Sequence, residues 1–241
     1  MHPILAKIGP FNIYSYGVMV AIGFGLASFL IYRNAARFNL NRDRVLDLSL
    51  LILLSGLVGA RLLYILLNIK YYVQNPVEIP DIAKGGLVWY GGFLLATLAA
   101  VWYIKKNKID FWLVTDLFAP YIALAQSFGR IGCFFNGCCY GITDALGRQY
   151  PIQLYASLAL FVIFLILLVW QRIPHFKGAI FLGYCILYSS KRFMIEFFRG
   201  DNPKDVMGLT ISQALSISIF IVSLILFVRK GIEWKKYLES K

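Results

Sequence analysis

Seven apolar segments, each about long enough to cross a lipid bilayer, dominate this chain of 241 residues. They lie at residues 14–32, 45–67, 87–104, 111–128, 152–170, 178–197 and 209–228. A helix that spans a bilayer needs ~20 mostly apolar residues. A chain with 59% hydrophobic residues also has too little polar sequence to cover the exterior of a water-soluble domain. The sequence therefore predicts an all-α, polytopic integral membrane protein with about seven transmembrane helices.

The seven segments follow one another without a long linker, a low-complexity tract or an obvious internal repeat. We therefore expect residues 1–241 to form a single transmembrane domain. The first segment has no basic region before it and no small-residue cleavage site after it. These features favour a retained span over a signal peptide.

The net charge of +12 is concentrated at the ends of alternate segments. Basic residues gather after the first, third, fifth and seventh segments: Arg33, Arg37, Arg42, Arg44, Lys105, Lys106, Lys108, Arg172, Lys177, Arg229, Lys230, Lys235, Lys236 and Lys241. Cytoplasmic ends of membrane helices are enriched in lysine and arginine, so we expect an N-terminus outside and a C-terminus in the cytoplasm. Residues 69–86, 129–151 and 198–208 would then face the outer side. The charge reflects topology and attraction to anionic lipid, and we expect no nucleic-acid partner.

Arg130 lies among glycines at the end of a very apolar segment, in the sequence Gly-Arg-Ile-Gly-Cys-Phe-Phe-Asn-Gly-Cys-Cys-Tyr-Gly of residues 129–141. An arginine near bilayer depth costs at least ~2.5 kcal/mol unless it reaches the interface, a wet cavity or an anion. A snorkelling arginine that marks the end of a helix is the structural alternative. A second charged cluster favours a functional role for Arg130.

That cluster consists of Tyr188, Arg192, Glu196 and Arg199, whose spacings of four, four and three residues place them on one stripe of a helix. Glu196 lies one turn beyond Arg192 and can hold its guanidinium in place. A self-contained ion pair, with Arg199 as an interfacial anchor, is the alternative. Two arginines at an outer-face cavity suit a phosphate, because the planar guanidinium forms bidentate hydrogen bonds to its oxygens. In a membrane the phosphate at hand belongs to a phospholipid head group.

Two glycine pairs, Gly85-Gly86 and Gly91-Gly92, flank the aromatic pair Trp89-Tyr90 near the start of the third segment. Glycines there permit close approach of a ligand to the backbone. Helix packing within an aromatic belt explains the same pattern equally well.

The order and spacing of the motifs resemble those of the bacterial prolipoprotein diacylglyceryl transferases nearly from end to end. The matching stretches are Tyr14-Ser15-Tyr16-Gly17, Gly59-Ala60-Arg61-Leu62, the glycine pairs of residues 85–92, Gly129–Gly141, Tyr150-Pro151-Ile152-Gln153-Leu154-Tyr155, Tyr188 to Arg199, and Ser212-Gln213. The resemblance implies an integral membrane enzyme of the bacterial inner membrane with its active site toward the outer face.

The implied reaction moves the diacylglyceryl group of phosphatidylglycerol to the lipobox cysteine thiol of a preprolipoprotein, without a cofactor or metal. Glycerol phosphate leaves, so positioned guanidiniums would stabilise developing negative charge. By the resemblance, Arg130 and Arg192 are the main catalytic phosphate ligands. The resemblance also assigns substrate binding or support to Tyr16, Asn136, Gly141, Tyr188, Glu196, Arg199, Arg61 and Gln153. Phosphatidylglycerol, a lipobox peptide and membrane lipids are the expected partners.

Tyr90 is a third catalytic candidate, at a position where many members of the family carry histidine. The attacking thiol needs a base or an electropositive setting, and a phenol with an ordinary pKa of ~10 is a weak base at neutral pH. Tyr90 would then only hydrogen-bond the substrate. Position 150 is likewise tyrosine where a His-Pro pair is common, so the base is unassigned. The glycerol phosphate product or a second lipid phosphate could also accept the proton.

Three of the four cysteines, Cys133, Cys138 and Cys139, are expected in the loop that holds Arg130, whereas Cys185 lies in another segment. A disulfide between Cys133 and either neighbour is one alternative outside the cytoplasm. Metal binding is a second alternative, against which stands the lack of a nearby histidine as fourth ligand. Our expectation is three reduced thiols that fill space.

Two other classes of membrane protein would use some of these residues. A transporter of an anionic lipid or solute would also need arginines within the membrane, usually together with repeat symmetry or broken helices. A metal-dependent phosphatidyl transferase would need clustered aspartates, but the acidic residues are scattered and no Asp-Gly pair occurs.

Overall fold

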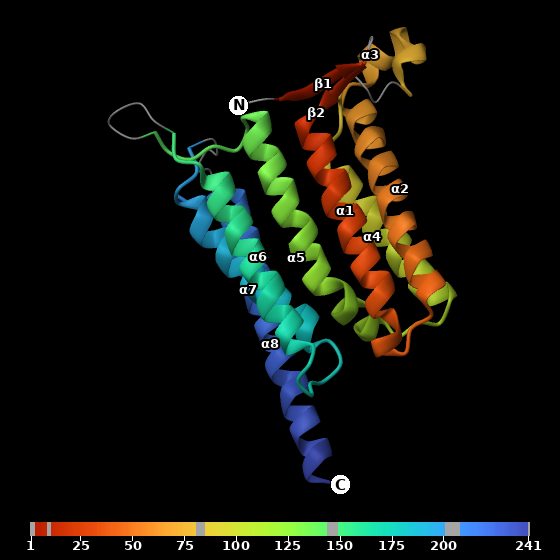
Figure 1. The fold of residues 1–241 in the computed structure, drawn as a ribbon, viewed down its shortest axis with the longest axis vertical. Coiled ribbons are helices and arrows are strands. Elements are labelled where there is room, and N and C mark those ends of the chain that lie inside the picture. The colour runs from red at the N-terminus through yellow and green to blue at the C-terminus, as the bar shows by residue number, and fades with distance from the viewer. Residues whose placement is uncertain (1–2, 9–10, 81–84, 144–148, 201–207, 241) are drawn as a thin grey trace. The chain divides into compact units, whose positions relative to one another are not determined.

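A computed structural model describes residues 3–8, 11–80, 85–143, 149–200 and 208–240 (Figure 1). A short hairpin of two strands, β1 (Ile4–Ile8) and β2 (Phe11–Tyr14), precedes the helices. The longer helices are α1 (Ser15–Asn34), α2 (Arg42–Leu67), α4 (Trp89–Lys106), α5 (Phe111–Asn136), α6 (Ile152–Trp170), α7 (Ala179–Glu196) and α8 (Ile211–Glu239). Shorter elements are the 3₁₀ turns η1 (Ala35–Phe38) and η2 (Pro76–Glu78) and helix α3 (Ile69–Gln74).

Each predicted segment corresponds to one long helix, and the all-α polytopic class is confirmed. Within the described residues, five helices are long and apolar enough to cross a membrane: α1 with its continuation to Phe38, α2, α5, α6 and α8. Helix α7 carries Lys191, Arg192 and Glu196, and α4 is 18 residues long and ends in two lysines. Polar residues thus set these two helices apart, and a count of seven spans stays a prediction.

The surface of the helices is apolar, and small polar residues are buried between them. Large side chains such as Phe29, Leu54 and Leu158 are about 60% exposed. Serines such as Ser127 and Ser157 are buried, and the Ser157 hydroxyl donates to the Ser127 carbonyl at 2.9 Å. Membrane helices commonly pack through small and polar residues because lipid solvates their apolar faces. This distribution fits a multi-pass membrane protein.

The chain divides into two compact units, residues 1–31 with 112–241 and residues 32–111. That residues 1–241 form a single domain stays a prediction. In the second unit, α2 and α4 pack through glycines. A Cβ on Gly59 or Gly91 would collide with the carbonyl oxygen of the other, and a Cβ on Gly92 would lie 2.8 Å from the Gly56 carbonyl oxygen. For the pair Gly91-Gly92, the structure therefore supports the helix-packing interpretation.

In the first unit, α7 is anchored to α5 by a buried carboxylate. Asp116 of α5 accepts hydrogen bonds from the backbone N–H groups of Gly178, at 2.6 Å, and Phe181, at 2.9 Å. These groups lie at the start of α7, where backbone donors lack partners within the helix. Asp116 thus caps α7 from a distant part of the chain and fixes the helix that carries the charged stripe.

Helix α1 packs against α5 through glycines in the same unit. A Cβ on Gly23 would lie 2.8 Å from the Cβ of Phe128, and one on Gly132 would lie 3.1 Å from the Tyr16 ring. Small residues at these positions let the two helices approach closely. The start of α1, with Tyr16, therefore lies against the end of α5, where Arg130 is located.

Candidate functional site

The charged stripe of α7 is held by the start of α8. The buried Glu196 carboxylate lies 3.1 Å from the Arg192 guanidinium through Oε2. Its Oε1 accepts a hydrogen bond from the Thr210 hydroxyl at 2.9 Å. A second guanidinium nitrogen of Arg192 donates to the Ser212 hydroxyl at 2.8 Å. The expected pairing of Glu196 with Arg192 is therefore present, and it orients the arginine through both ends of its fork.

Thr210 and Gln213 fix the start of α8 that supplies these contacts. The Thr210 hydroxyl accepts from the Gln213 backbone N–H at 3.2 Å, and the Gln213 side-chain oxygen accepts from the Thr210 N–H at 3.0 Å. This reciprocal capping box satisfies two backbone donors at once. Both residues are almost fully buried. Gln213 belongs to one of the motifs recognised in the sequence, whereas no sequence pattern predicts Thr210 as a partner of Glu196.

Arg199 also faces the carboxylate of Glu196, at 3.9 Å from Oε2. A single acidic group therefore lies beside two guanidiniums, and the pair is not self-contained. Arg199 is mostly buried, with its side chain 10% exposed. The interfacial-anchor alternative for Arg199 is less favoured, because an anchor would extend into water.

Arg130 lies within α5 and not in a loop, because the helix continues past residue 128 to Asn136. This corrects the expectation that Arg130 lies in the loop after the fourth apolar segment. Gly132 is instead buried against Tyr16 and Met19. No hydrogen bond or ion pair joins the Arg130 guanidinium to any residue that the structure describes. The positive charge of Arg130 interacts electrostatically with both Lys191 and Arg192. The three basic side chains therefore lie in one region.

Lys191 also belongs to this region and was not among the predicted site residues. Its ammonium lies 4.8 Å from the centroid of the Tyr188 ring, in a cation–π contact. Tyr188 in turn packs against Tyr184 with ring centroids 5.6 Å apart. The available signal was the spacing of three residues between Tyr188 and Lys191, which places them on the same helix face. Tyr188 thus supports a cation beside the arginines.

Three guanidiniums, those of Arg130, Arg192 and Arg199, and the amine of Lys191 therefore accompany one carboxylate among the residues that the structure describes at this site. Asp201 and Asp205 belong to the segment outside the described residues. An excess of positive charge in a partly buried place favours an anion with several oxygens. The alternative of a snorkelling Arg130 does not explain why other cations are gathered around it.

Gly141 joins the loop after α5 to the chain after α7. Residues 141 and 199 pair as neighbours in an isolated antiparallel bridge, and the Ile142 N–H donates to the Phe198 carbonyl at 2.9 Å. A Cβ on Gly141 would lie within about 3.0 Å of two carbonyl oxygens, those of Tyr150 and Phe198. Only glycine fits without displacing the backbone, so Gly141 shapes the site. Asn136, the last residue of α5, is exposed.

Gln153 of α6 also supports this loop. Its side-chain nitrogen donates to the Cys138 carbonyl at 2.8 Å, and the residue is 2% exposed. Its side-chain oxygen is buried and has no hydrogen-bond partner among the described residues. A buried acceptor without a donor is costly. The predicted supporting role of Gln153 fits the first contact, and the second leaves an acceptor for a bound hydroxyl.

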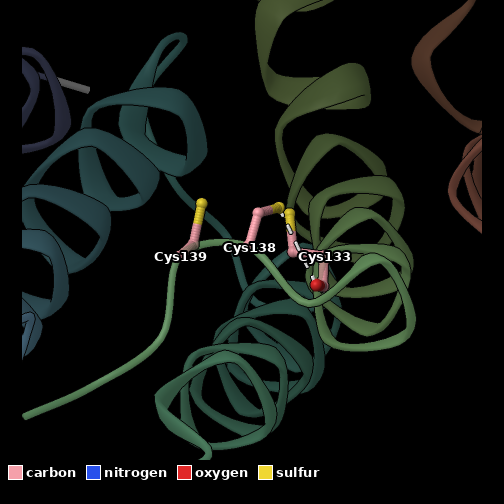
Figure 2. Close-up of side chains that lie close together, drawn as sticks. All are labelled: Cys133, Cys138 and Cys139. Atoms are coloured by element: carbon pink, nitrogen blue, oxygen red, sulfur yellow. Dashed lines mark hydrogen bonds between the residues drawn. The ribbon is translucent and has the colours of Figure 1, made fainter. Parts of the chain in front are cut away.

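The three clustered cysteines come from two elements, as Figure 2 shows. Cys133 lies on α5, whereas Cys138 and Cys139 lie in the following loop, so only two of the three occupy the expected loop. All three are free thiols whose sulfurs lie within 4.8 Å of one another. A hydrogen bond from the Cys133 thiol, together with the charges of Arg199 and Arg130, lowers the pKa of Cys139 to about 5 despite its burial.

In the other unit, Arg61 holds the chain that precedes α4. Its guanidinium donates to the carbonyl oxygens of Glu78, Ile79, Gly85 and Gly86 at 2.7–3.2 Å. Its charge also lies 5.4 Å from the Tyr72 ring centroid. A cavity of about 190 Å³ adjoins these groups. Since most of its donors bind the backbone, Arg61 stabilises this segment and is not a free phosphate ligand.

Tyr90, at the start of α4, is 63% exposed and packs edge-on against Trp89 at 5.3 Å. Its hydroxyl forms no hydrogen bond with a described residue. Tyr90 and Arg61 belong to the unit of residues 32–111. The arginine cluster, which consists of Arg130, Arg192 and Arg199, belongs to the other unit. A catalytic role for Tyr90 stays a prediction.

Comparison with known proteins agrees with the resemblance seen in the motifs. The family described as prolipoprotein diacylglyceryl transferase matches residues 3–229. A phosphatidylglycerol–prolipoprotein diacylglyceryl transferase of Clostridium tetani is 32% identical, over 94% of this chain and 97% of that protein. One from Bacillus mycoides is 32% identical over 98% of this chain and 96% of its own length. A Clostridium perfringens protein with the same name and the number 2 is 34% identical over the full length of both chains.

Proposed function

Since the chain belongs to the prolipoprotein diacylglyceryl transferase family, we propose that it transfers diacylglyceryl from phosphatidylglycerol to the cysteine thiol of a prolipoprotein. The thiol sulfur forms a bond to the glyceryl carbon, and the bond from that carbon to the phosphate oxygen breaks. The products are a thioether and glycerol phosphate, and the thiol proton passes to a base. No oxidation or reduction occurs in this exchange.

The observation that carries the proposal is the partly buried Arg130 guanidinium, which forms no hydrogen bond or ion pair with a described residue, beside Lys191 and Arg192. A lipid phosphate would supply an ion-pair partner for this guanidinium. The guanidinium can donate two parallel hydrogen bonds to phosphate oxygens. As the glyceryl carbon–oxygen bond breaks, negative charge grows on the departing phosphate, so donors already in place stabilise the transition state more than the bound lipid.

Arg192 is proposed as the second phosphate ligand, held in position by Glu196 and Ser212. These contacts fix the guanidinium before the lipid binds, which reduces the reorganisation needed during the reaction. Arg199 and Lys191 add positive charge around the leaving group. Tyr188 supports Lys191 through its ring. Tyr16 lies against the end of α5 and is a candidate contact for the lipid.

The head group of phosphatidylglycerol carries hydroxyls that need acceptors. The buried side-chain oxygen of Gln153 has no donor among the described residues and is proposed to accept one of them. Asn136 and Gly141 lie on either side of the cysteine loop, which Gln153 also holds. These residues are proposed to form the pocket for the glycerol end of the lipid. Tyr90 is proposed to orient substrate and not to act as the base.

The proposed setting is the bacterial inner membrane, with the N-terminus outside, the C-terminus in the cytoplasm and the arginine cluster toward the outer face. Support comes from the basic residues after α1, α4, α6 and α8, which the positive-inside rule assigns to the cytoplasm. Arg130, Arg192 and Arg199 lie near the end of α5 and the end of α7, which the same rule assigns to the outer side.

The test is a transfer assay with the purified full-length protein, phosphatidylglycerol labelled in its glycerol backbone and a lipobox peptide. We expect label on the peptide in a bond that resists mild alkaline hydrolysis, together with release of glycerol phosphate. A cysteine-to-serine lipobox peptide is the matched control and should receive no label. Movement of labelled lipid between vesicles without transfer to the peptide would favour a transporter and contradict the proposal.

A further inference from the structure

We propose that Cys133, Cys138 and Cys139 form a binding site for one thiophilic cation of the Zn²⁺ type. The proposal concerns a site distinct from the phosphate ligands, and it does not depend on the transferase reaction. It replaces our expectation from the sequence that the three cysteines only fill space. From the sequence alone, the lack of a nearby histidine argues against metal binding.

The distances between the sulfurs fit a common ion. All three Sγ atoms lie within 4.8 Å of one another. Zinc binds thiolates at ~2.3 Å in tetrahedral geometry, which requires sulfurs ~3.8 Å apart. The side chains therefore need to close by about 1 Å or less, which small changes in rotamer can supply. A histidine ligand is not required, because three thiolates and one open position satisfy a four-coordinate zinc site.

The backbone brings these sulfurs together in an uncommon way. Neighbouring side chains in an extended strand would point apart, yet the sulfurs of Cys138 and Cys139 both lie within 4.8 Å of the sulfur of Cys133 at the end of α5. The turn uses positive φ angles at Gly137, of 74°, and at Cys139, of 60°. Positive φ is unfavourable for a residue with a side chain. The Cys138 N–H donates to the Cys133 carbonyl at 3.2 Å, and Gln153 binds the Cys138 carbonyl, so the loop is fixed.

The charge around the cluster also suits a metal bound by thiolates. Three thiolates and one divalent cation carry a net charge of −1, which needs compensation in a partly buried place. The positive charges of Arg130 and Arg199 interact favourably with negative charge on the Cys139 sulfur of this cluster. A bare cation beside two arginines would be repelled, but an anionic complex would be stabilised. A disulfide would use only two of the three sulfurs and leaves the third unexplained.

The test uses the purified full-length protein, reduced with a phosphine and freed of metal by a chelator that is then removed. We expect one equivalent of Zn²⁺ to bind. Co²⁺ should bind at the same site and produce a sulfur-to-metal charge-transfer band with the visible bands of a tetrahedral ion. Bound Zn²⁺ should also protect three cysteines from alkylation, counted by intact mass. These three measurements need no variant, so misfolding cannot obscure them.

Single variants then assign the ligands. Cys133→Ser, Cys138→Ser and Cys139→Ser should each weaken Zn²⁺ binding by at least about tenfold, since even outer groups around metal sites change affinity by ~10–100-fold. Cys185→Ser is the matched control, because Cys185 is a half-buried free cysteine of α7 outside the cluster. It should bind Zn²⁺ like the unchanged protein. No charge-transfer band with Co²⁺, or an affinity that is equal in all four variants, would overturn the proposal.

Discussion

Glu196 binds Arg192 at 3.1 Å and, through its other oxygen, accepts a hydrogen bond from Thr210 at 2.9 Å. The carboxylate thus links a cation of α7 to the residue that caps α8. Its side chain is completely buried. A buried ion pair is stable only if good geometry and further hydrogen bonds offset the cost of desolvation. Glu196 is therefore a positioning residue for Arg192, and the lipid phosphate would meet a guanidinium that is already oriented.

Glu196→Gln should reduce transfer by about tenfold or more, because a hydrogen bond to a charged group contributes ~1.5–3 kcal/mol. The neutral amide can still accept from Thr210 but no longer attracts Arg192. Initial rates at several phosphatidylglycerol concentrations provide the measurement. Thr210→Val, which keeps the shape of the side chain, should have a smaller effect in the same direction. If Glu196→Gln were fully active while Arg192→Lys was inactive, the pairing would have no role in catalysis.

Asp116→Ala should lower the stability of the protein by ~1–2 kcal/mol, the range for loss of a helix cap, and its thermal midpoint in detergent should fall. Asp116→Asn should lose less, because the amide oxygen can still accept one of the two backbone hydrogen bonds at the start of α7. Glu239→Gln is the control, since this exposed carboxylate at the end of α8 pairs with Lys235 at the surface. Equal midpoints for all four proteins would contradict the capping role.

Gly59→Ala should destabilise the packing of α2 against α4 by ~1–3 kcal/mol, as overpacking does in other cores. The added Cβ would meet the backbone of Gly91, which cannot move as a flexible side chain can. Gly25→Ala is a matched control in α1, because nothing lies within 4 Å of its added Cβ. Thermal unfolding of the two variants in detergent provides the comparison. A midpoint for Gly59→Ala at or above that of Gly25→Ala would show that the contact tolerates a methyl group.

Tyr90→Phe should lose about tenfold or less in transfer rate, the effect of one hydrogen bond of ~0.5–1.5 kcal/mol, because we propose that Tyr90 orients substrate. Tyr90→His tests the alternative of a base. An imidazole base would restore activity after a loss of ~10²-fold in Tyr90→Phe, and the rising limb of the pH profile would move toward ~6.5. Rates measured across several pH values distinguish the two roles. A nearly inactive Tyr90→Phe protein that still binds phosphatidylglycerol would contradict orientation.

The helices could be predicted from sequence because long apolar runs have few alternatives in a membrane. The exception was α5, whose continuation to Asn136 depends on Gly132 packing against Tyr16 of α1. A glycine inside a helix resembles a helix end until its neighbour is known. The β1–β2 hairpin was also missed, since its strands have only five and four residues.

The charged residues of the site could be predicted, but most of their partners could not. The pairing of Glu196 with Arg192 follows from helical spacing. By contrast, Thr210 reaches Glu196, and Asp116 reaches Gly178, only after distant segments fold together. The cluster of three cysteine sulfurs likewise depends on the positive φ angle of Cys139. No local sequence pattern predicts that angle. Side-chain contacts between distant segments were therefore beyond prediction from this single sequence.

The most direct test of the central claim is the transfer rate of Arg130→Lys under saturating phosphatidylglycerol and lipobox peptide. Lysine keeps the charge but loses the bidentate fork, so we expect a loss on the order of a hundredfold or more, as when an oxyanion donor is removed. Arg229→Lys, at an exposed arginine of α8, should retain the unchanged rate. An Arg130→Lys protein as active as Arg229→Lys would contradict the account, because a guanidinium that pairs with no described residue would then have no part in holding the phosphate.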